Sequence, residues 1–451
     1  MDQELLEKKR KLFSFFIMIF AAMGGILYGY DIGVISGALL FMQRDISLTP
    51  SEVSFIVAAV LGGGSIATLI SGPLADHFGR RRMISFSAIV VMIGTIILVI
   101  SHSYFSVICG RLIQGIGIGI ITIVIPLYLT EAISSSVRGR GVATFQLFLT
   151  GGILLAYLIN LFFEETGNWR GMFLCVLAPG SLLFLGSLFL PESPSWLFFH
   201  RDREQAMRSL LRMRSEEETS KELLEMGELR ESSSKIRWKR YYLTPLFMAL
   251  CIACFNQLTG INVFLQFITV ILKNEGLTSN LLSMMGGVGV GLMNFLMTIL
   301  SLLLVDRLGR KPLLSIGTAG ITVALLFAGF VAFYLPTGLL KGYLLMASLI
   351  AFVLFFALGP GVVVWLALSE LLPTAIRSMG MALCLFVNSL TSTLLATFYL
   401  DLVEKIGYAG TFWLCAFFTF LYFLIACFFL PETKNRSLEE IENLFRNRDT
   451  R

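Results

Sequence analysis

Residues 72–82 read GPLADHFGRRR, and residues 306–311 repeat the end of that stretch as DRLGRK. Each copy is basic and lies between two long apolar runs. A run of about 20 apolar residues is long enough to cross a bilayer as a helix. Both copies therefore predict a tight basic loop between two membrane-crossing helices. Their recurrence predicts that the chain consists of two similar halves.

The composition supports a membrane protein. Of the 451 residues, 56% are hydrophobic and 14% are charged, whereas soluble domains average about 25% charged residues. The apolar residues form solid blocks rather than the alternating pattern of barrel strands. We expect an all-α membrane protein with twelve transmembrane helices in two six-helix halves. The expected crossings are 13–41, 53–74, 83–101, 104–129, 141–163, 171–190, 243–273, 281–304, 312–334, 343–368, 379–401 and 409–430.

The basic residues indicate the orientation. Of the 35 Lys and Arg residues, 29 lie in the termini and in alternate connections, and 5 lie in the other set of connections. The positive-inside rule therefore predicts a cell membrane protein with both termini in the cytoplasm. The long connection mixes Glu, Arg and Leu at helical spacing, which predicts short amphipathic helices on the cytoplasmic face. The expected units are a first half at 1–196, a linker at 197–242, a second half at 243–430 and a tail at 431–451.

The sequence offers no support for an enzyme. The seven cysteines lie inside apolar blocks, and the three histidines lie in separate loops. Cys251 and Cys254 form a C-x-x-C pair without a neighbouring histidine or carboxylate, so small buried side chains are the simpler interpretation. We expect no metal, no cofactor and no nucleic-acid partner.

Asp31 and Arg111 are the two charged residues that fall well inside the apolar blocks. At a rise of about 1.5 Å per residue, both lie roughly 13–20 Å below the outer ends of their helices. Charges inside a membrane are costly, so a pair at matched depth predicts a functional site. A static buried salt bridge is the alternative.

Beyond these features, the chain resembles the sugar porter family of the major facilitator superfamily from Gly24 to Ile441. The stretches that carry the resemblance are GYDIGVISGAL (29–39), GPLADHFGRRR (72–82), GR (110–111), PLYLTE (126–131), RG (138–139), PESPSWL (191–197), QLTGIN (257–262), DRLGRK (306–311), GPG (359–361), Trp365 and PETKNRSLEEI (431–441). The resemblance implies the major facilitator fold and transport of a sugar by alternating access.

The same resemblance implies roles for individual residues. Proton-coupled members carry an aspartate at the position of Asp31, which implies proton coupling by Asp31 and Arg111. The positions that match the family's sugar-binding residues are Gln146, Asn256, Gln257, Asn262, Asn294, Trp365 and Asn388. The chain departs from the family pattern at Asn256, at Gln266-Phe267 and at Ser389, where many members have glutamine, a tyrosine pair and tryptophan.

Matched acidic and basic residues recur in both halves, and we expect them to form ion-pair networks at the inner ends of the helices. These networks are expected to latch the outward-facing state and to break during transport. The expected latch residues are Asp76, Arg80, Glu131, Arg138 and Glu192 in the first half, and Asp306, Arg310, Glu370, Arg377 and Glu432 in the second.

The function predicted from these features is proton-coupled symport of a monosaccharide, with a hexose such as glucose as the first expectation. The expected partners are the sugar, the proton and the bilayer, and the protein is expected to work as a monomer. Two alternatives on the same fold are a polyol- or inositol-proton symporter and a facilitative sugar uniporter. An alternative from another class is a sugar sensor that does not transport.

Overall fold

The computed structural model describes residues 2–133, 138–232, 240–373, 376–434, 440–442 and 445. Helices account for most of these residues, and no strand occurs among them. The helices of the first half are α1 (Asp2–Asp45), α2 (Pro50–Phe78), α3 (Arg80–Val99), α4 (Tyr104–Ala132), α5 (Arg138–Phe162), α6 (Trp169–Leu174) and α7 (Leu177–Ser187). The connection between the halves contains α8 (Pro194–His200), α9 (Arg203–Leu211), α10 (Glu216–Ser232) and the 3-10 turn η1 (Arg240–Tyr242). The second half contains α11 (Leu243–Leu258), α12 (Ile261–Glu275), α13 (Asn280–Leu308), α14 (Arg310–Tyr334), α15 (Leu339–Leu358), α16 (Pro360–Leu371), α17 (Arg377–Leu424) and the π-helical turn η2 (Ile425–Phe429).

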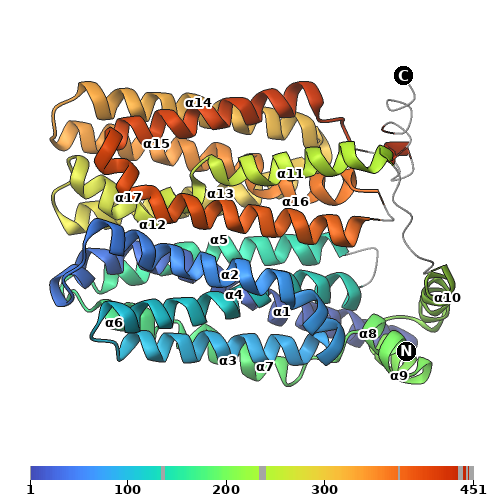
Figure 1. The fold of residues 1–451 in the computed structure, drawn as a ribbon. Helices are drawn as coiled ribbons and strands as arrows, with labels where there is room; N and C mark the ends of the chain where they lie inside the picture. Colours follow the sequence, from blue (N-terminus) through green and yellow to red (C-terminus); the bar gives the residue numbers. More distant parts are fainter. Residues whose placement is uncertain are drawn as a thin grey trace.

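The structure confirms the predicted membrane-crossing architecture. Within the described residues, 11 helical segments are long and apolar enough to cross a membrane. The last of them, Met379–Phe429, contains a break at Gly407, whose φ is 71°. A straight helix of the 48 residues of α17 would be about 72 Å long, more than twice the hydrocarbon thickness. Because α17 turns back on itself at Gly407 (Figure 1), this segment supplies two crossings, which makes twelve.

Three of the predicted crossings are broken rather than continuous. The segment at 171–190 divides into α6 and α7, because Pro179 has no N–H to donate to the carbonyl of Cys175. The segment at 243–273 divides into α11 and α12 at Gly260, which has a left-handed φ of 86°. The segment at 343–368 divides into α15 and α16 at Gly359-Pro360. Hydropathy alone does not reveal such breaks, because the flanking residues remain apolar.

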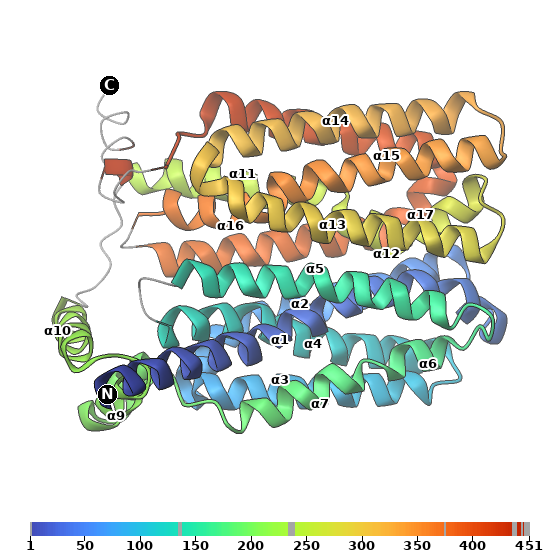
Figure 2. The same cartoon turned by 180° about the vertical axis from the view of Figure 1, so that it is seen from behind.

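The crossing helices form two groups that lie against each other (Figures 1 and 2). Helices α1–α7 form the first half, and α11–α17 with η2 form the second half. The start of α1 and the short helices α8–α10 lie beyond the same end of both halves, which we call the terminal end. The opposite end is called the far end. The short helices predicted between the halves are therefore present.

A row of glycines allows α1 to pack closely on α5. Gly25, Gly29, Gly33 and Gly37 are spaced by four residues and lie on one face of the helix. A Cβ at Gly29 would lie 1.8 Å from the carbonyl oxygen of Leu149, and one at Gly25 would lie 2.5 Å from the Phe145 oxygen. Small residues at this spacing allow helix backbones to approach each other in a membrane. The row therefore sets the distance between α1, which carries Asp31, and α5.

We predict that Gly29→Ala destabilises the protein, because the new methyl group cannot fit against the α5 backbone. Overpacking of this kind typically costs about 1–3 kcal/mol. The midpoint of thermal unfolding in detergent should therefore fall. Gly72→Ala is the matched control, since a Cβ at Gly72, on α2, meets nothing within 4 Å. Equal midpoints for both variants would contradict the role assigned to the glycine row.

Candidate functional site

Asp31 and Arg111 form a buried ion pair between α1 and α4. The Arg111 Nη1 lies 2.6 Å from the Asp31 Oδ1. Asp31 is 4% exposed and Arg111 is 0% exposed. The sequence predicted matched depth for these two residues, and the structure places them in direct contact. Neutralising one partner of an ion pair removed from water in this way leaves the other charge uncompensated, so protonation of Asp31 would change the energy of this site strongly.

Other polar side chains extend this pair to α3. The same Arg111 Nη1 donates to the Gln114 Oε1 at 3.2 Å, and the Gln114 Nε2 donates to the Thr95 Oγ1 at 2.8 Å. The Arg111 Nε and Nη2 are buried and have no hydrogen-bond partner in the structure. The Phe173 ring lies 5.5 Å from the guanidinium carbon. Sequence reasoning missed Gln114 and Thr95, although Gln114 stands one helical turn after Arg111 and could have indicated a shared face.

Three of the predicted sugar-binding amides form one hydrogen-bonded cluster in the second half. The Gln257 Nε2 donates to the Asn388 Oδ1 at 3.1 Å, and the Asn262 Nδ2 donates to the Gln257 Oε1 at 2.9 Å. The Asn262 Nδ2 also lies 2.9 Å from the Ser392 Oγ. These residues come from α11, α12 and α17, and the break at Gly260 brings Asn262 back towards Gln257. We call Gln257, Asn262 and Asn388 the amide cluster.

The other predicted sugar-binding residues lie on neighbouring helices. Asn256 precedes the cluster on α11, and its Oδ1 is buried without a hydrogen-bond partner. Asn294 is buried on α13, whereas Gln146 on α5 and Trp365 on α16 are partly exposed. Within the described part of the chain, the side chains of Gln146, Asn294 and Trp365 make no hydrogen bond to the amide cluster. Amide groups that make no described hydrogen bond leave donors and acceptors available for a polar ligand.

The two halves contact each other from the middle of the helices to the far end. The Ser65 Oγ lies 2.8 Å from the Ser389 Oγ and 3.1 Å from the Thr393 Oγ1. Nearer the far end, the Tyr157 hydroxyl donates to the Leu265 oxygen at 2.8 Å, and the Ser51 hydroxyl donates to Asp401. Sequence reasoning gave no indication of the Ser65–Ser389 contact. Ser389 was noted only as a departure from the tryptophan that many family members have at this position.

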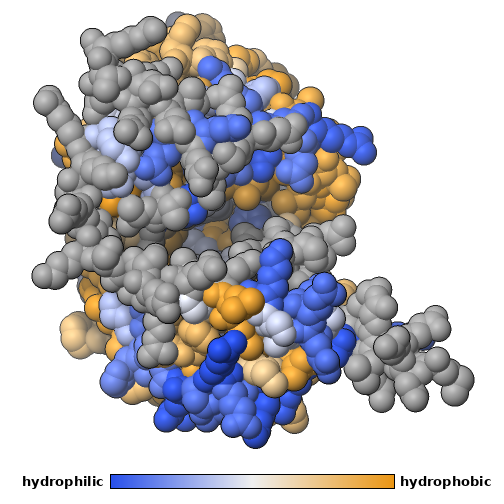
Figure 3. All heavy atoms as spheres, turned by 90° about the vertical axis from the view of Figure 1, so that its right-hand side faces the viewer, coloured by the Kyte–Doolittle hydropathy of each residue, from blue (hydrophilic) through white to orange (hydrophobic). Residues whose placement is uncertain are grey.

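The terminal end is open between the halves. Figure 3 views the molecule from this end and shows a recess between the two groups of helices. Among the described residues, no hydrogen bond or ion pair joins the two halves there. The structure is therefore closed at the far end and open towards the terminal end.

An ion-pair network lies at the terminal end of the first half. The Arg80 guanidinium donates to both oxygens of Glu131, at 2.9 and 3.0 Å, and also contacts Asp76 at 2.9 Å. The Glu192 Oε1 accepts the backbone N–H groups of Arg80 and Arg81 at 2.8 and 3.1 Å, which caps the start of α3. This arrangement holds α2, α3, α4 and the segment after α7 together.

The second half repeats this network contact for contact. Arg310 donates to Glu370 at 2.9 Å and contacts Asp306 at 3.3 Å. Glu432 accepts the backbone N–H groups of Arg310 and Lys311, both at 3.1 Å. Gly79 and Gly309 have φ values of 93° and 95°, and a Cβ at either would lie within 3 Å of the Glu192 or Glu432 carboxylate. A glycine is therefore required at both positions for the carboxylate to reach the backbone.

Arg138 and Arg377 are the other two predicted latch residues. The side chain of Arg138 lies outside the described residues. Arg377 donates to the Leu372 carbonyl oxygen at 3.3 Å. Burial lowers the pKa of Arg377, and the nearby Glu442 carboxylate opposes that effect. The described ion pairs of both networks join helices of the same half, so the predicted latch between conformational states stays a prediction.

A family profile described as "Sugar (and other) transporter" matches residues 17–445. The chain belongs to this sugar transporter family. The glucose transporter GlcP of Staphylococcus epidermidis is 36% identical, over 96% of this chain and 98% of the relative. The galactose-proton symporter of Escherichia coli K12 is 32% identical, over all of this chain and 98% of the relative.

The fold of this sugar transporter matches a solved major facilitator structure. The inward-open conformation of the xylose transporter XylE from E. coli superposes with a TM-score of 0.82 at 26% identity, covering 96% of this chain and 99% of that one. The family assignment made from the sequence motifs is therefore confirmed, and the family is one of transporters rather than enzymes.

We predict that Arg80→Ala destabilises the first half, because the largely buried Glu131 carboxylate loses its bidentate partner and keeps the Ser193 hydroxyl as a donor. Loss of charged hydrogen bonds to a buried group costs about 1–3 kcal/mol. Thermal unfolding of the purified variant in detergent measures the loss. Arg82→Ala is the control, since Arg82 lies in the same basic run and is exposed. If both variants unfold at the wild-type temperature, the network does not stabilise this end of the protein.

Proposed function

We propose that the protein is a proton-coupled symporter of a monosaccharide that works by alternating access. The observation that carries this proposal is the fully buried Asp31–Arg111 pair in a sugar transporter. A carboxylate in this position can alternate between a protonated state and an ionised state paired with Arg111. Two similar relatives are a glucose transporter and a galactose-proton symporter, which supports a hexose as the sugar and the proton as the coupling ion.

The recess and the amide cluster support a sugar site between the halves. Gln257 lies 14 residues after the start of α11, and Asn294 lies 14 residues before the end of α13, so both are about 21 Å from the terminal end of their helices. Major facilitator transporters bind substrate near the middle of the membrane between their two halves. Amides suit sugar hydroxyls because each offers a donor and an acceptor. We assign sugar binding to Gln146, Asn256, Asn294, Trp365 and the amide cluster.

The remaining assignments complete this proposal. The excess of basic residues in the terminal-end connections supports a cytoplasmic location for that end and for both termini. The open recess then corresponds to an inward-facing state of a cell membrane protein. The proposed units are 1–196, 197–242, 243–430 and 431–451, with the networks of Arg80 and Arg310 acting as latches during the cycle. The protein is proposed to act as a monomer without catalytic activity.

We predict that Asp31→Asn abolishes uphill accumulation of sugar and retains sugar exchange across the membrane. Asparagine keeps an oxygen that can accept from Arg111 but cannot release a proton at neutral pH. Purified protein in proteoliposomes is tested with an imposed pH gradient, against a panel of hexoses, pentoses, inositol and other polyols. The mutant should bring the sugar only to the external concentration. Asp45→Asn, at the exposed end of the same helix, should accumulate sugar like the wild type.

Two results would contradict this assignment. If Asp31→Asn still concentrates the sugar, Asp31 is not the coupling carboxylate. If the wild type equilibrates sugars without responding to the pH gradient, the protein is a uniporter. Selective accumulation of inositol or another polyol would replace the monosaccharide in the proposal.

We predict that Gln146→Ala and Gln257→Ala each weaken sugar binding by at least tenfold. Each substitution leaves a sugar hydroxyl without a partner in a dry site, a loss of about 1–3 kcal/mol. Isothermal titration of the purified, monodisperse variants measures the affinity. Asn274→Ala is the control, since Asn274 is an amide near the far end that bonds to Tyr408. Unchanged affinity in both glutamine variants would show that these amides only hold helices together.

A further inference from the structure

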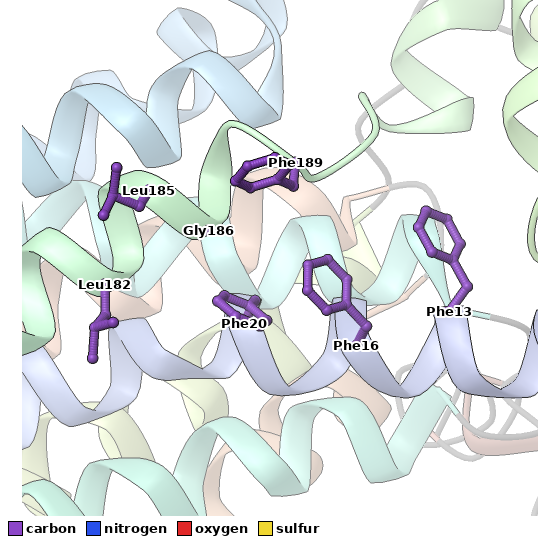
Figure 4. Close-up of a pocket in the computed structure, with 7 residues that line it drawn as sticks. All are labelled: Phe13, Phe16, Phe20, Leu182, Leu185, Gly186 and Phe189. Carbon is purple, nitrogen blue, oxygen red and sulfur yellow. The ribbon is translucent and has the colours of Figure 1, made fainter.

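A separate apolar groove of about 640 Å³ lies on the outside of the first half, near the terminal end (Figure 4). Its two walls come from the start of α1 and the end of α7. The lining side chains are Phe13, Phe16 and Phe20 on α1, and Leu182, Leu185 and Phe189 on or just after α7. None of these residues belongs to the proposed sugar site or to the ion-pair networks.

The groove faces the surroundings of the protein rather than its core. Leu182, Leu185 and Phe189 are 51%, 52% and 73% exposed. The floor is closed where the Phe20 ring meets Gly186, since a Cβ there would lie 2.1 Å from the Phe20 Cδ1. Any side chain at Gly186 would therefore push the Phe20 ring outward and fill the groove. Gly186 and the three phenylalanines together leave the apolar groove open on a membrane-facing surface.

A basic side chain lies at the terminal end of the groove, which we call its mouth. Arg10 precedes Phe13 by three residues, so it lies on the face of α1 that carries Phe13, Phe16 and Phe20. The rise from Arg10 to Phe20 is about 15 Å. A ligand bound along this face would place a polar group at Arg10 and an apolar chain along Phe13 to Phe20.

Two basic side chains are described at the start of α1. Lys8 and Arg10 have no ion-pair partner within the described part of the chain. On the opposite wall, Arg81 donates to the carbonyl oxygens of Ser187 and Leu188 at 3.1 and 2.6 Å. A guanidinium is therefore fixed next to Phe189, beside the end of α7. Basic side chains next to a membrane surface attract anionic lipid headgroups.

We propose that this groove binds one anionic phospholipid from the cytoplasmic leaflet, with an acyl chain along the three phenylalanines and its phosphate against Arg10. The leaflet follows from the orientation proposed above. A second copy of the chain is a poorer occupant, because a two-fold interface brings the same patch of both copies together. The basic mouths would then face each other and repel.

The second half has a groove in the equivalent place. It has a volume of about 810 Å³ and lies between the start of α11 and η2, with Leu243 and Phe247 on one wall and Ile425 and Phe429 on the other. In both halves, the first and last crossing helices therefore diverge at the terminal end. The fold therefore creates an apolar groove in each half. In the proposal, the basic mouth of the first groove gives that groove its preference for an anionic lipid.

The proposal is tested by titrating delipidated protein in detergent with phosphatidylglycerol or with phosphatidylcholine of the same acyl chains. Native mass spectrometry counts the bound lipids and reports the oligomeric state. The wild type should bind one phosphatidylglycerol at least fivefold more tightly than phosphatidylcholine. Arg10→Gln should weaken phosphatidylglycerol binding about fivefold, which is the contribution of one basic side chain near an anionic surface. Phe16→Ala should weaken the binding of both lipids.

Matched variants separate this site from general lipid association. Arg44→Gln removes a basic residue at the far end of α1, and Phe15→Ala removes an exposed ring that does not line the groove. Both should bind lipid like the wild type. Equal binding of the two lipids, equal losses for Arg10→Gln and Arg44→Gln, no loss for Arg10→Gln, or a dimer without bound lipid would each overturn the proposal. Because the readout is lipid binding, it does not depend on whether the protein transports sugar with protons.

Discussion

Hydrocarbon does not solvate charge, and this constraint explains where the ion pairs described above lie. The Asp31–Arg111 pair lies inside the first half, and both side chains are buried. The other strong ion pairs described above gather at the ends of the helices, where Arg80 and Arg310 each bind a carboxylate. The Asp31–Arg111 pair is the exception. Burying these two charges is costly, so a change in the charge of Asp31 would alter the energy of the protein strongly.

The two halves contain the same set of ionic contacts at their terminal ends. In each half an arginine bridges two carboxylates, and a third carboxylate caps the backbone of the next helix. The glycine before that arginine has a left-handed conformation, which leaves room for the capping carboxylate. This repetition explains why the spacing of Asp, Gly, Arg and Glu recurs in the sequence. The spacing records a three-dimensional network rather than a requirement for positive charge alone.

Sequence periodicity and composition predicted the fold in most respects, because long apolar runs and basic loops leave few arrangements in a bilayer. The pairing of Asp31 with Arg111 could also be predicted, since similar depth and opposite charge favour it. The Ser65–Ser389 contact was not, because serines are common in apolar helices and carry no pairing signal. Lys341 was predicted as a loop residue, yet it is buried against Glu275 at 2.6 Å. Such pairs depend on how helices distant in sequence are oriented.

The strengths of the contacts indicate which parts of the molecule can move. Within the halves, α1 and α5 touch backbone to backbone, and charged hydrogen bonds hold the terminal ends. Between the halves, the described polar contacts are mainly hydrogen bonds of hydroxyl groups, such as those of Ser65 and Tyr157. A neutral hydrogen bond contributes about 0.5–1.5 kcal/mol, and a charged one about twice as much. Among the described polar contacts, those between the halves are therefore the cheaper ones to break. A movement of one half against the other, as the proposed alternating access requires, would break hydroxyl hydrogen bonds and leave the charged contacts within each half intact.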